Sequence, residues 1–488
     1  MITIQKITRS ASLVIECCLL TKLQIFVHEV DLVRECLLTL QGSTTLEVAT
    51  YRLAHISSSS QAATLARISS LSRQVVDLRL FTGTIFALAL KRHPIRTLEA
   101  FATGVCLLLD EFATQCAQIE AEILRGQCST SQPTTITLLS LLAQLREPTQ
   151  LFGALHDLVC GFATAGAGPL DSFSDLAHRL AIGSPSTVAK LILDDVFGLH
   201  QVKAAVGELL IARKIGTLIN ATAEPLWRMS ATWLRDGLSV EPMQWGQEHL
   251  YGPRGEFFVE RHTGCAPNSP EFWTHAYSLR REDDADDAES GASLVPRLFE
   301  PLARSLLATG KTVGLLRILG VDTVTSAITE QVQCWRSVND VVTSRCQLDL
   351  DSERTASALD EHLQPCFEMV QSGFKSILVE RCRFWLSLTA VQGICYSSHG
   401  DIVSDFCDAV FRVMDEQGPA WNPDTYFLQS TFQDAITIAG PEHAFVDPEL
   451  VRFPRTGIRN RPTGAHTVEA LNSLSVEILV CTDVVSHR

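Results

Sequence analysis

The chain has 488 residues, 46% of them hydrophobic and 19% charged, and its formal net charge is −15. This composition excludes a chain that is disordered throughout, because it supplies enough apolar side chains for a large core, divided among about three domains or helical sub-bundles. The acidic balance argues against a broad surface for nucleic acid or for anionic membrane, since either would need an excess of basic residues.

The N-terminal segment, residues 1–26, contains an apolar run from Leu13 to Leu20, which Glu16 interrupts and Lys22 follows. The run is too short to span a membrane, and no small-residue cleavage site of a signal peptide follows it. We therefore expect a soluble, intracellular protein and leave this segment unassigned.

The fifteen cysteines are scattered and include no Cys-x-x-Cys pair. Several, such as Cys106, Cys116 and Cys407, fall on apolar faces, where a reduced cysteine acts as a small buried hydrophobic residue. His262 and Cys265 lie close together but lack partners at zinc-ligand spacing. The sequence therefore predicts no metal site and no cofactor.

Helical periodicity dominates the chain, so the predicted fold class is all-α with very few short strands. The clearest helix is 98–123, where one apolar stripe comprises Leu98, Phe101, Val105, Leu108, Phe112, Cys116, Ile119 and Ile123. Further helices are predicted near 30–40, 62–91, 136–145, 150–163, 172–181, 186–195, 199–214, 222–236, 325–345, 354–393 and 400–416. The best strand signals are 256–261 and 474–480.

Three segments are predicted to be loops or linkers. Residues 241–255 and 440–466 are rich in proline and glycine. Residues 281–293 carry six acidic residues between Glu282 and Glu289, which repel one another and favour a mobile, solvated surface loop. An acidic docking site is the alternative interpretation of that run.

The segment 306–320 contains Gly310-Lys311-Thr312, which resembles the end of a phosphate-binding P-loop. Such a loop also needs a glycine five residues before Gly310, where this chain has Ser305. The apolar residues around it are spaced three or four apart, so Lys311 is predicted to lie within or beside a helix, as a solvated lysine next to a small residue. We therefore predict that the segment binds no nucleotide, and because no catalytic motif is present elsewhere, that the protein is not an enzyme.

Four fragments between 223 and 320 resemble the signature of the gamma-tubulin complex component family, also called the GRIP-motif family. In order they are Trp233–Gly237, Glu256–Val259, Trp273–Arg280 and Pro296–Thr312. Segments 27–42 and 51–58 resemble the start of the family's N-terminal domain, and 388–436 resembles its C-terminal domain, closest to the component five subtype. The resemblance covers most of residues 27–480.

The resemblance implies an elongated stack of helical bundles without a catalytic centre. Residues 27–321 would form the N-terminal domain, which contacts neighbouring components laterally, and 322–480 the first part of the domain that holds gamma-tubulin. Residues 481–488 are a tail. The family's usual ending is missing around 471–480, so we expect a C-terminally truncated chain that binds gamma-tubulin weakly or not at all alone.

The implied function is that of a structural component of the gamma-tubulin complex, which scaffolds microtubule nucleation at spindle poles and microtubule-organising centres in the cytoplasm. Its partners would be other components of the complex, with no nucleic acid and no membrane insertion. The alternative is a helical rod of another kind, such as a vesicle-tethering subunit. A nucleotide hydrolase ranks third, because it would require phosphate binding at 310–312.

The resemblance also selects the residues expected to matter structurally. Five aromatic residues are expected to organise the core of the signature block: Trp233, Phe257, Phe258, Trp273 and Tyr277. Arg280 and Lys311 are expected either to brace helices at a bundle junction or to be surface cations. Gly237, Glu256, Pro296 and Gly310 complete the signature, and no catalytic residue is predicted.

Overall fold

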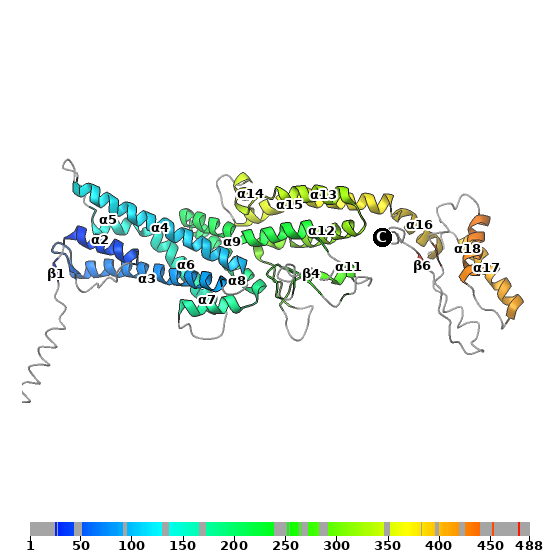
Figure 1. The fold of residues 1–488 in the computed structure, drawn as a ribbon, viewed down its shortest axis with the longest axis horizontal. Helices are drawn as coiled ribbons and strands as arrows, with labels where there is room; N and C mark the ends of the chain where they lie inside the picture. The colour runs from blue at the N-terminus through cyan, green and yellow to red at the C-terminus, as the bar shows by residue number, and fades with distance from the viewer. Residues whose placement is uncertain are drawn as a thin grey trace, which may run out of the picture. The chain divides into compact units, whose positions relative to one another are not determined.

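The structure is a computed structural model in which helices account for most of the described residues, as the all-α prediction expects (Figure 1). It describes residues 25–26, 28–42, 51–90, 95–128, 136–164, 172–238, 251–252, 254–262, 265, 272–282, 291–345, 352–381, 383–395, 400–418, 425–439, 451–452 and 477–478. The chain divides into two compact units, one of residues 1–311 with 329–365, the other of residues 312–328 with 366–488.

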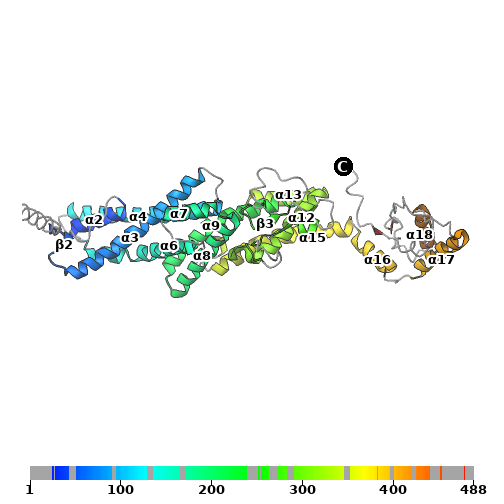
Figure 2. The ribbon, with the colours of Figure 1, turned by 90° about the horizontal axis from the view of Figure 1, so that it is seen from below.

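The first unit begins with a bundle of long helices (Figures 1 and 2). These are α2 (Glu29–Leu40), α3 (Ser58–Ala89), α4 (Arg96–Cys128), α5 (Leu138–Gln144), α6 (Arg146–Thr164), α7 (Phe173–Ile182), α8 (Pro185–Val206) and α9 (Leu209–Asp236). Side chains of Ser57, Thr137 and Ser172 accept hydrogen bonds from the first turns of α3, α5 and α7 and so cap these helices.

The long helix α4 packs against α3 and α9. All eight residues of its predicted apolar stripe are buried. The ring of Phe101 lies edge-on to those of Phe81 in α3 and Phe162 in α6, with centroids 6.4 and 6.0 Å away. The 3.6-residue periodicity therefore predicted both this helix and the face that it buries.

The predicted boundaries of helices 186–195 and 199–214 are wrong. Helix α8 continues to Val206, and Gly207 ends it with a left-handed φ of 85°, which a glycine adopts without steric cost. The predicted break between residues 214 and 222 is absent, because α9 runs unbroken through Pro225. A single glycine thus set the junction that apolar spacing alone had misplaced.

The strands of the described residues are short and form three two-stranded sheets. Strand β3 (Val259–Arg261) pairs antiparallel with β4 (Tyr277–Leu279), so only the second half of the predicted strand 256–261 is a strand. Strands β1 (Ile25–Phe26) and β2 (Tyr51–Arg52) pair in parallel, and β5 (Val451–Arg452) pairs antiparallel with β6 (Glu477–Ile478). The last strand covers two residues of the predicted strand 474–480.

The predicted loops lie largely outside the described residues, including residues 283–290 of the acidic run. The two ends of that run are described and meet: Arg281 forms an isolated β-bridge with Ser293, and the Glu282 amide donates to the Ala292 carbonyl at 2.9 Å. The predictions of a mobile loop or an acidic docking site there stay untested.

Further helices follow: α11 (Phe272–His275), the 3-10 turn η1 (Arg297–Phe299), α12 (Glu300–Ile318), α13 (Asp322–Gln333), α14 (Val338–Arg345), α15 (Ser352–Glu380), α16 (Phe384–Cys395), α17 (Gly400–Gln417) and α18 (Thr425–Ala439). The predicted helices 325–345 and 354–393 are each two helices. In the second unit α17 and α18 pack together over a cluster of buried residues, Ile402, Val410, Leu428, Phe432, Ala435 and Ile436. No described helix is long and apolar enough to cross a membrane.

Several of the described cysteines are buried, but of the three named in the sequence analysis only Cys116 is. Cys36, Cys116 and Cys366 are buried, and Cys106 and Cys407 are half-buried. Burial raises the pKa of Cys116 and of Cys366 to about 11, so both stay protonated at neutral pH.

Candidate functional site

The signature block is built around Trp233, which lies near the C-terminal end of α9 and is fully buried. Its indole Nε1 donates a hydrogen bond of 2.9 Å to the Leu306 carbonyl oxygen of α12. The rings of Tyr277 and Tyr251 pack against it, with centroids 5.2 and 5.5 Å away. One side chain therefore joins two helices to the β3–β4 hairpin.

Two further aromatic residues of the signature continue this core. Phe257 and Phe258 are buried, their ring centroids are 4.4 Å apart, and Phe258 contacts the ring of Phe299 in η1 at 5.7 Å. Pro296 is buried at the N-terminal end of η1. Phe299 and Tyr251 belong to this cluster although neither is among the residues selected from the sequence: Phe299 lies inside the fragment Pro296–Thr312, whereas Tyr251 lies outside all four fragments.

The two signature glycines are sites of close backbone approach. At Gly310 an added Cβ atom would collide with the pyrrole ring of Trp233. Gly237 follows α9 with φ 65° and ψ −162°, a conformation essentially limited to glycine. This turn lets the Leu238 amide donate to the Gly310 carbonyl at 3.1 Å, so the two glycines bring α9 and α12 together.

Arg280 braces the hairpin from inside. Its side chain is 4% exposed; Nη2 donates to the Gly252 carbonyl at 2.8 Å and Nε to the Phe257 carbonyl at 3.3 Å. Nη1 lies 3.7 Å from a carboxylate oxygen of Glu260. The fixed fork of a guanidinium suits several carbonyls at once, so the interpretation of Arg280 as a surface cation is wrong.

Lys311 lies inside α12, as predicted, but it is not a solvated lysine. Its side chain is 8% exposed, and Nζ donates to the carbonyl oxygens of Trp273 and Thr274 at 2.9 and 3.2 Å. Burial lowers the pKa of this ammonium group. Of the two alternatives offered by the sequence, the one in which Lys311 braces neighbouring elements agrees with this geometry.

Trp273 is the exception among the five aromatic residues. Its side chain is 39% exposed, so the prediction that it lies in the core is wrong. The short helix α11 directs the neighbouring Phe272 inward instead, and Phe272 is buried. Trp273 contributes to the block through its backbone carbonyl, which accepts the hydrogen bond from Lys311.

Glu256 connects the block to the helical bundle. Its carboxylate oxygens accept hydrogen bonds from the backbone amides of Arg96 at 2.9 Å and of Thr97 at 2.6 Å, at the start of α4. It is 6% exposed, and burial raises its pKa although these hydrogen bonds act in the opposite direction. A side chain distant in the sequence thus caps α4, a role that no local pattern at residue 96 indicates.

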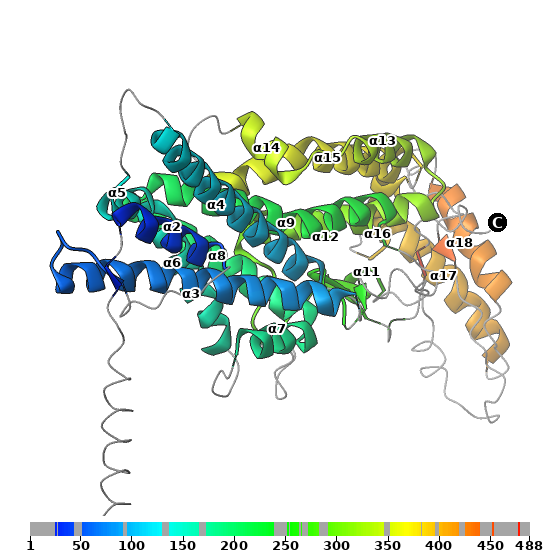
Figure 3. The same ribbon diagram turned by 60° about the vertical axis from the view of Figure 1, so that its left-hand side comes forward.

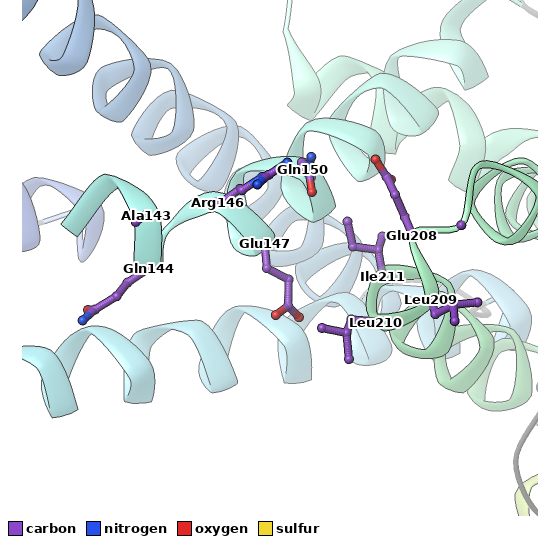
Figure 4. A pocket seen from close by; sticks show the side chains of 10 residues that line it. Ala143, Gln144, Arg146, Glu147, Gln150, Glu208, Leu209, Leu210 and Ile211 are labelled. Carbon is purple, nitrogen blue, oxygen red and sulfur yellow. The ribbon is translucent and has the colours of Figure 1, made fainter. Parts of the chain in front are cut away.

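This arrangement offers polar contacts for the protein's own backbone rather than for a substrate. Among the described residues no group of three or more His, Cys, Asp or Glu side chains is arranged to hold a metal ion. A surface pocket of about 460 Å³ lies elsewhere in the first unit, between the α5–α6 turn and the start of α9 (Figure 4). Its lining includes Arg146, Glu147 and Glu208 but none of the signature residues.

Nucleotide binding by 310–312 is expected to be undetectable. These residues lie in the interior of α12, where the backbone amides are used in the helix, and the Lys311 ammonium is already bound to two carbonyl oxygens. Isothermal titration with Mg-ATP and with Mg-GTP measures this directly. A micromolar affinity that disappears in Lys311→Ala would contradict the prediction.

Comparison with known protein families gives the following match. The model described as "Gamma tubulin complex component N-terminal" matches residues 33–381, which include the complete signature block and continue past residue 321. No curated protein matches the sequence.

Proposed function

Since the chain belongs to the gamma-tubulin complex component family, we propose that it is a structural component of the gamma-tubulin complex that scaffolds microtubule nucleation at spindle poles and microtubule-organising centres. The observation that carries this proposal is the family match over residues 33–381. A component of this complex works in the cytoplasm, as part of the cytoskeleton.

The contacts of the signature block support a scaffolding role. Trp233, Glu256 and Lys311 each join elements that are distant in the sequence, and their polar atoms bind backbone groups of the same chain. The two buried cations of the block, Arg280 and Lys311, likewise donate to backbone carbonyl oxygens of the same chain. Rigid helical surfaces are what a protein requires to hold neighbours in a defined arrangement.

The N-terminal domain of the family implies assembly with other components of the complex. We propose that residues 27–321 supply the lateral contacts and that residues 322–480 belong to the domain that holds gamma-tubulin. We also propose the component five subtype, on the resemblance of residues 388–436.

Co-purification tests this function. The purified chain is expected to capture a separately purified neighbouring component of the complex, because that contact belongs to the N-terminal domain. Gamma-tubulin is added alone in a second arm, which separates direct capture from capture through a neighbour. A chain that is helical by circular dichroism and yet captures no component and no gamma-tubulin would contradict the proposal.

A further inference from the structure

The C-terminal half of α3 carries an apolar stripe on its outer face, which we call the α3 seam. It consists of Val76, Leu80, Gly83, Ala87 and Leu90, spaced four, three, four and three residues apart. All five are exposed: Val76 by 46%, Leu80 by 47% and Leu90 by 91%. This is the spacing of the contact positions in a coiled coil.

The α3 seam continues a face that is already an interface inside the unit. On the N-terminal half of α3 the same face is covered by α2, where Leu65 is buried and Ser72 Oγ donates to the Thr39 carbonyl at 2.9 Å. Further along α3, Arg79 Nη1 donates a hydrogen bond of 2.8 Å to the carbonyl oxygen of Gln41, at the C-terminal end of α2. Beyond it α3 continues without α2 (Figure 3).

The exposed C-terminal half of α3 has the apolar composition that is typical of a buried helix. Residues 80–90 include no charged side chain, although a solvent-facing helix normally carries charges on its outer face. The opposite face is filled by Leu78, Phe81 and Ile85, which are buried. Because α3 is apolar on this outer face as well as on the faces packed against α4, α6 and α7, it is expected to have a further neighbour there.

Gly83 lies at the centre of the α3 seam, and no contact among the described residues explains it. An added Cβ atom would have no heavy atom within 4 Å, and the residue is in the interior of a helix. Glycine destabilises such a position relative to alanine, because its backbone loses more conformational freedom on folding. A reason for glycine there is the close approach of a backbone from outside the chain.

The α3 seam is complementary to itself. If a second α3 lies antiparallel across it with the two-fold axis at Gly83, Val76 of each copy meets Leu90 of the other, and Leu80 meets Ala87. The pair next to the glycine contact then joins a large side chain, Leu80, to a small one, Ala87, and the outer pair joins two branched aliphatic side chains. Each pair occurs twice, as a two-fold symmetric interface requires.

We propose that the α3 seam is a self-association surface, occupied by the α3 helix of a second copy of this chain. The three- and four-residue spacing fits a helix and does not fit an extended strand, whose side chains repeat every two residues. This inference goes beyond the proposed function and stands on α3 alone.

A charge-complementation experiment tests this pairing. Sedimentation equilibrium of the full chain is expected to show a dimer, which Leu80→Glu and Ala87→Lys each weaken by about tenfold or more. Mixing the two variants is expected to restore association, because the carboxylate introduced into one chain would face the ammonium group introduced into the other, while the second pair stays Leu–Ala. Val202→Glu, which removes an exposed apolar side chain of α8, is the matched control and is expected to leave the dimer unchanged.

The proposal would be overturned by a wild-type chain that is monomeric at all concentrations, by a dimer that neither charge variant weakens, or by variants that do not associate on mixing. Both substitutions are at exposed positions, so the fold is expected to persist, and circular dichroism confirms this for each sample. If a different component of the complex binds the α3 seam and a second copy of this chain does not, self-association is rejected. That result would leave the proposed function standing.

Discussion

Trp233→Ala is expected to lower the free energy of unfolding of the first unit by about 4 kcal/mol. The indole is fully buried, so the substitution leaves a cavity between α9, α12 and the β3–β4 hairpin. It also removes the donor to the Leu306 carbonyl and the ring contacts with Tyr277 and Tyr251. Urea denaturation followed by circular dichroism measures the effect.

A double-mutant cycle separates this packing from a general loss of hydrophobicity. Gly310→Ala alone is expected to destabilise the unit, because its methyl group would collide with the pyrrole ring of Trp233. In a Trp233→Phe background that ring is absent, so the same substitution is expected to cost less. Strictly additive effects of the two substitutions would contradict the proposed contact.

Glu256→Ala is the second substitution with a large expected effect, a loss of about 3 kcal/mol in the free energy of unfolding. It leaves the amides of Arg96 and Thr97 without their acceptor at the buried start of α4. It also removes a negative charge from the N-terminal end of that helix, where the helix dipole favours one. Chemical denaturation and hydrogen exchange of the first turn of α4 measure the two consequences.

Two control variants make this prediction specific. Glu256→Gln keeps the shape of the side chain but only one acceptor oxygen, and its NH2 group faces a backbone N–H that also donates. It is therefore expected to lower the free energy of unfolding substantially. Glu99→Ala removes a carboxylate from the same first turn but leaves the Glu256 cap in place. It is expected to lower the free energy of unfolding by less than about 1 kcal/mol. Equal effects of Glu99→Ala and Glu256→Ala would show that charge alone, rather than the cap, stabilises α4.

The sequence by itself determined the all-α class, the approximate positions of most helices and the face that α4 buries. The stripe from Leu98 to Ile123 required no information beyond its own spacing, because a helix with one apolar side gains most from burying that side. The same reasoning argued against a P-loop at Lys311, since the helical spacing continues through Gly310, which lies inside α12. Family resemblance then selected Trp233 as a central residue, and it is fully buried.

Only the tertiary structure decided which polar residues are buried and what they bind. Arg280 and Lys311 bind carbonyl oxygens 23 or more residues away, and Glu256 binds amides 160 and 159 residues away. Local sequence patterns report the periodicity of one element, whereas these contacts depend on which elements are brought together. The exposure of Trp273 was decided in the same way, because the short α11 presents Phe272 to the core in its place.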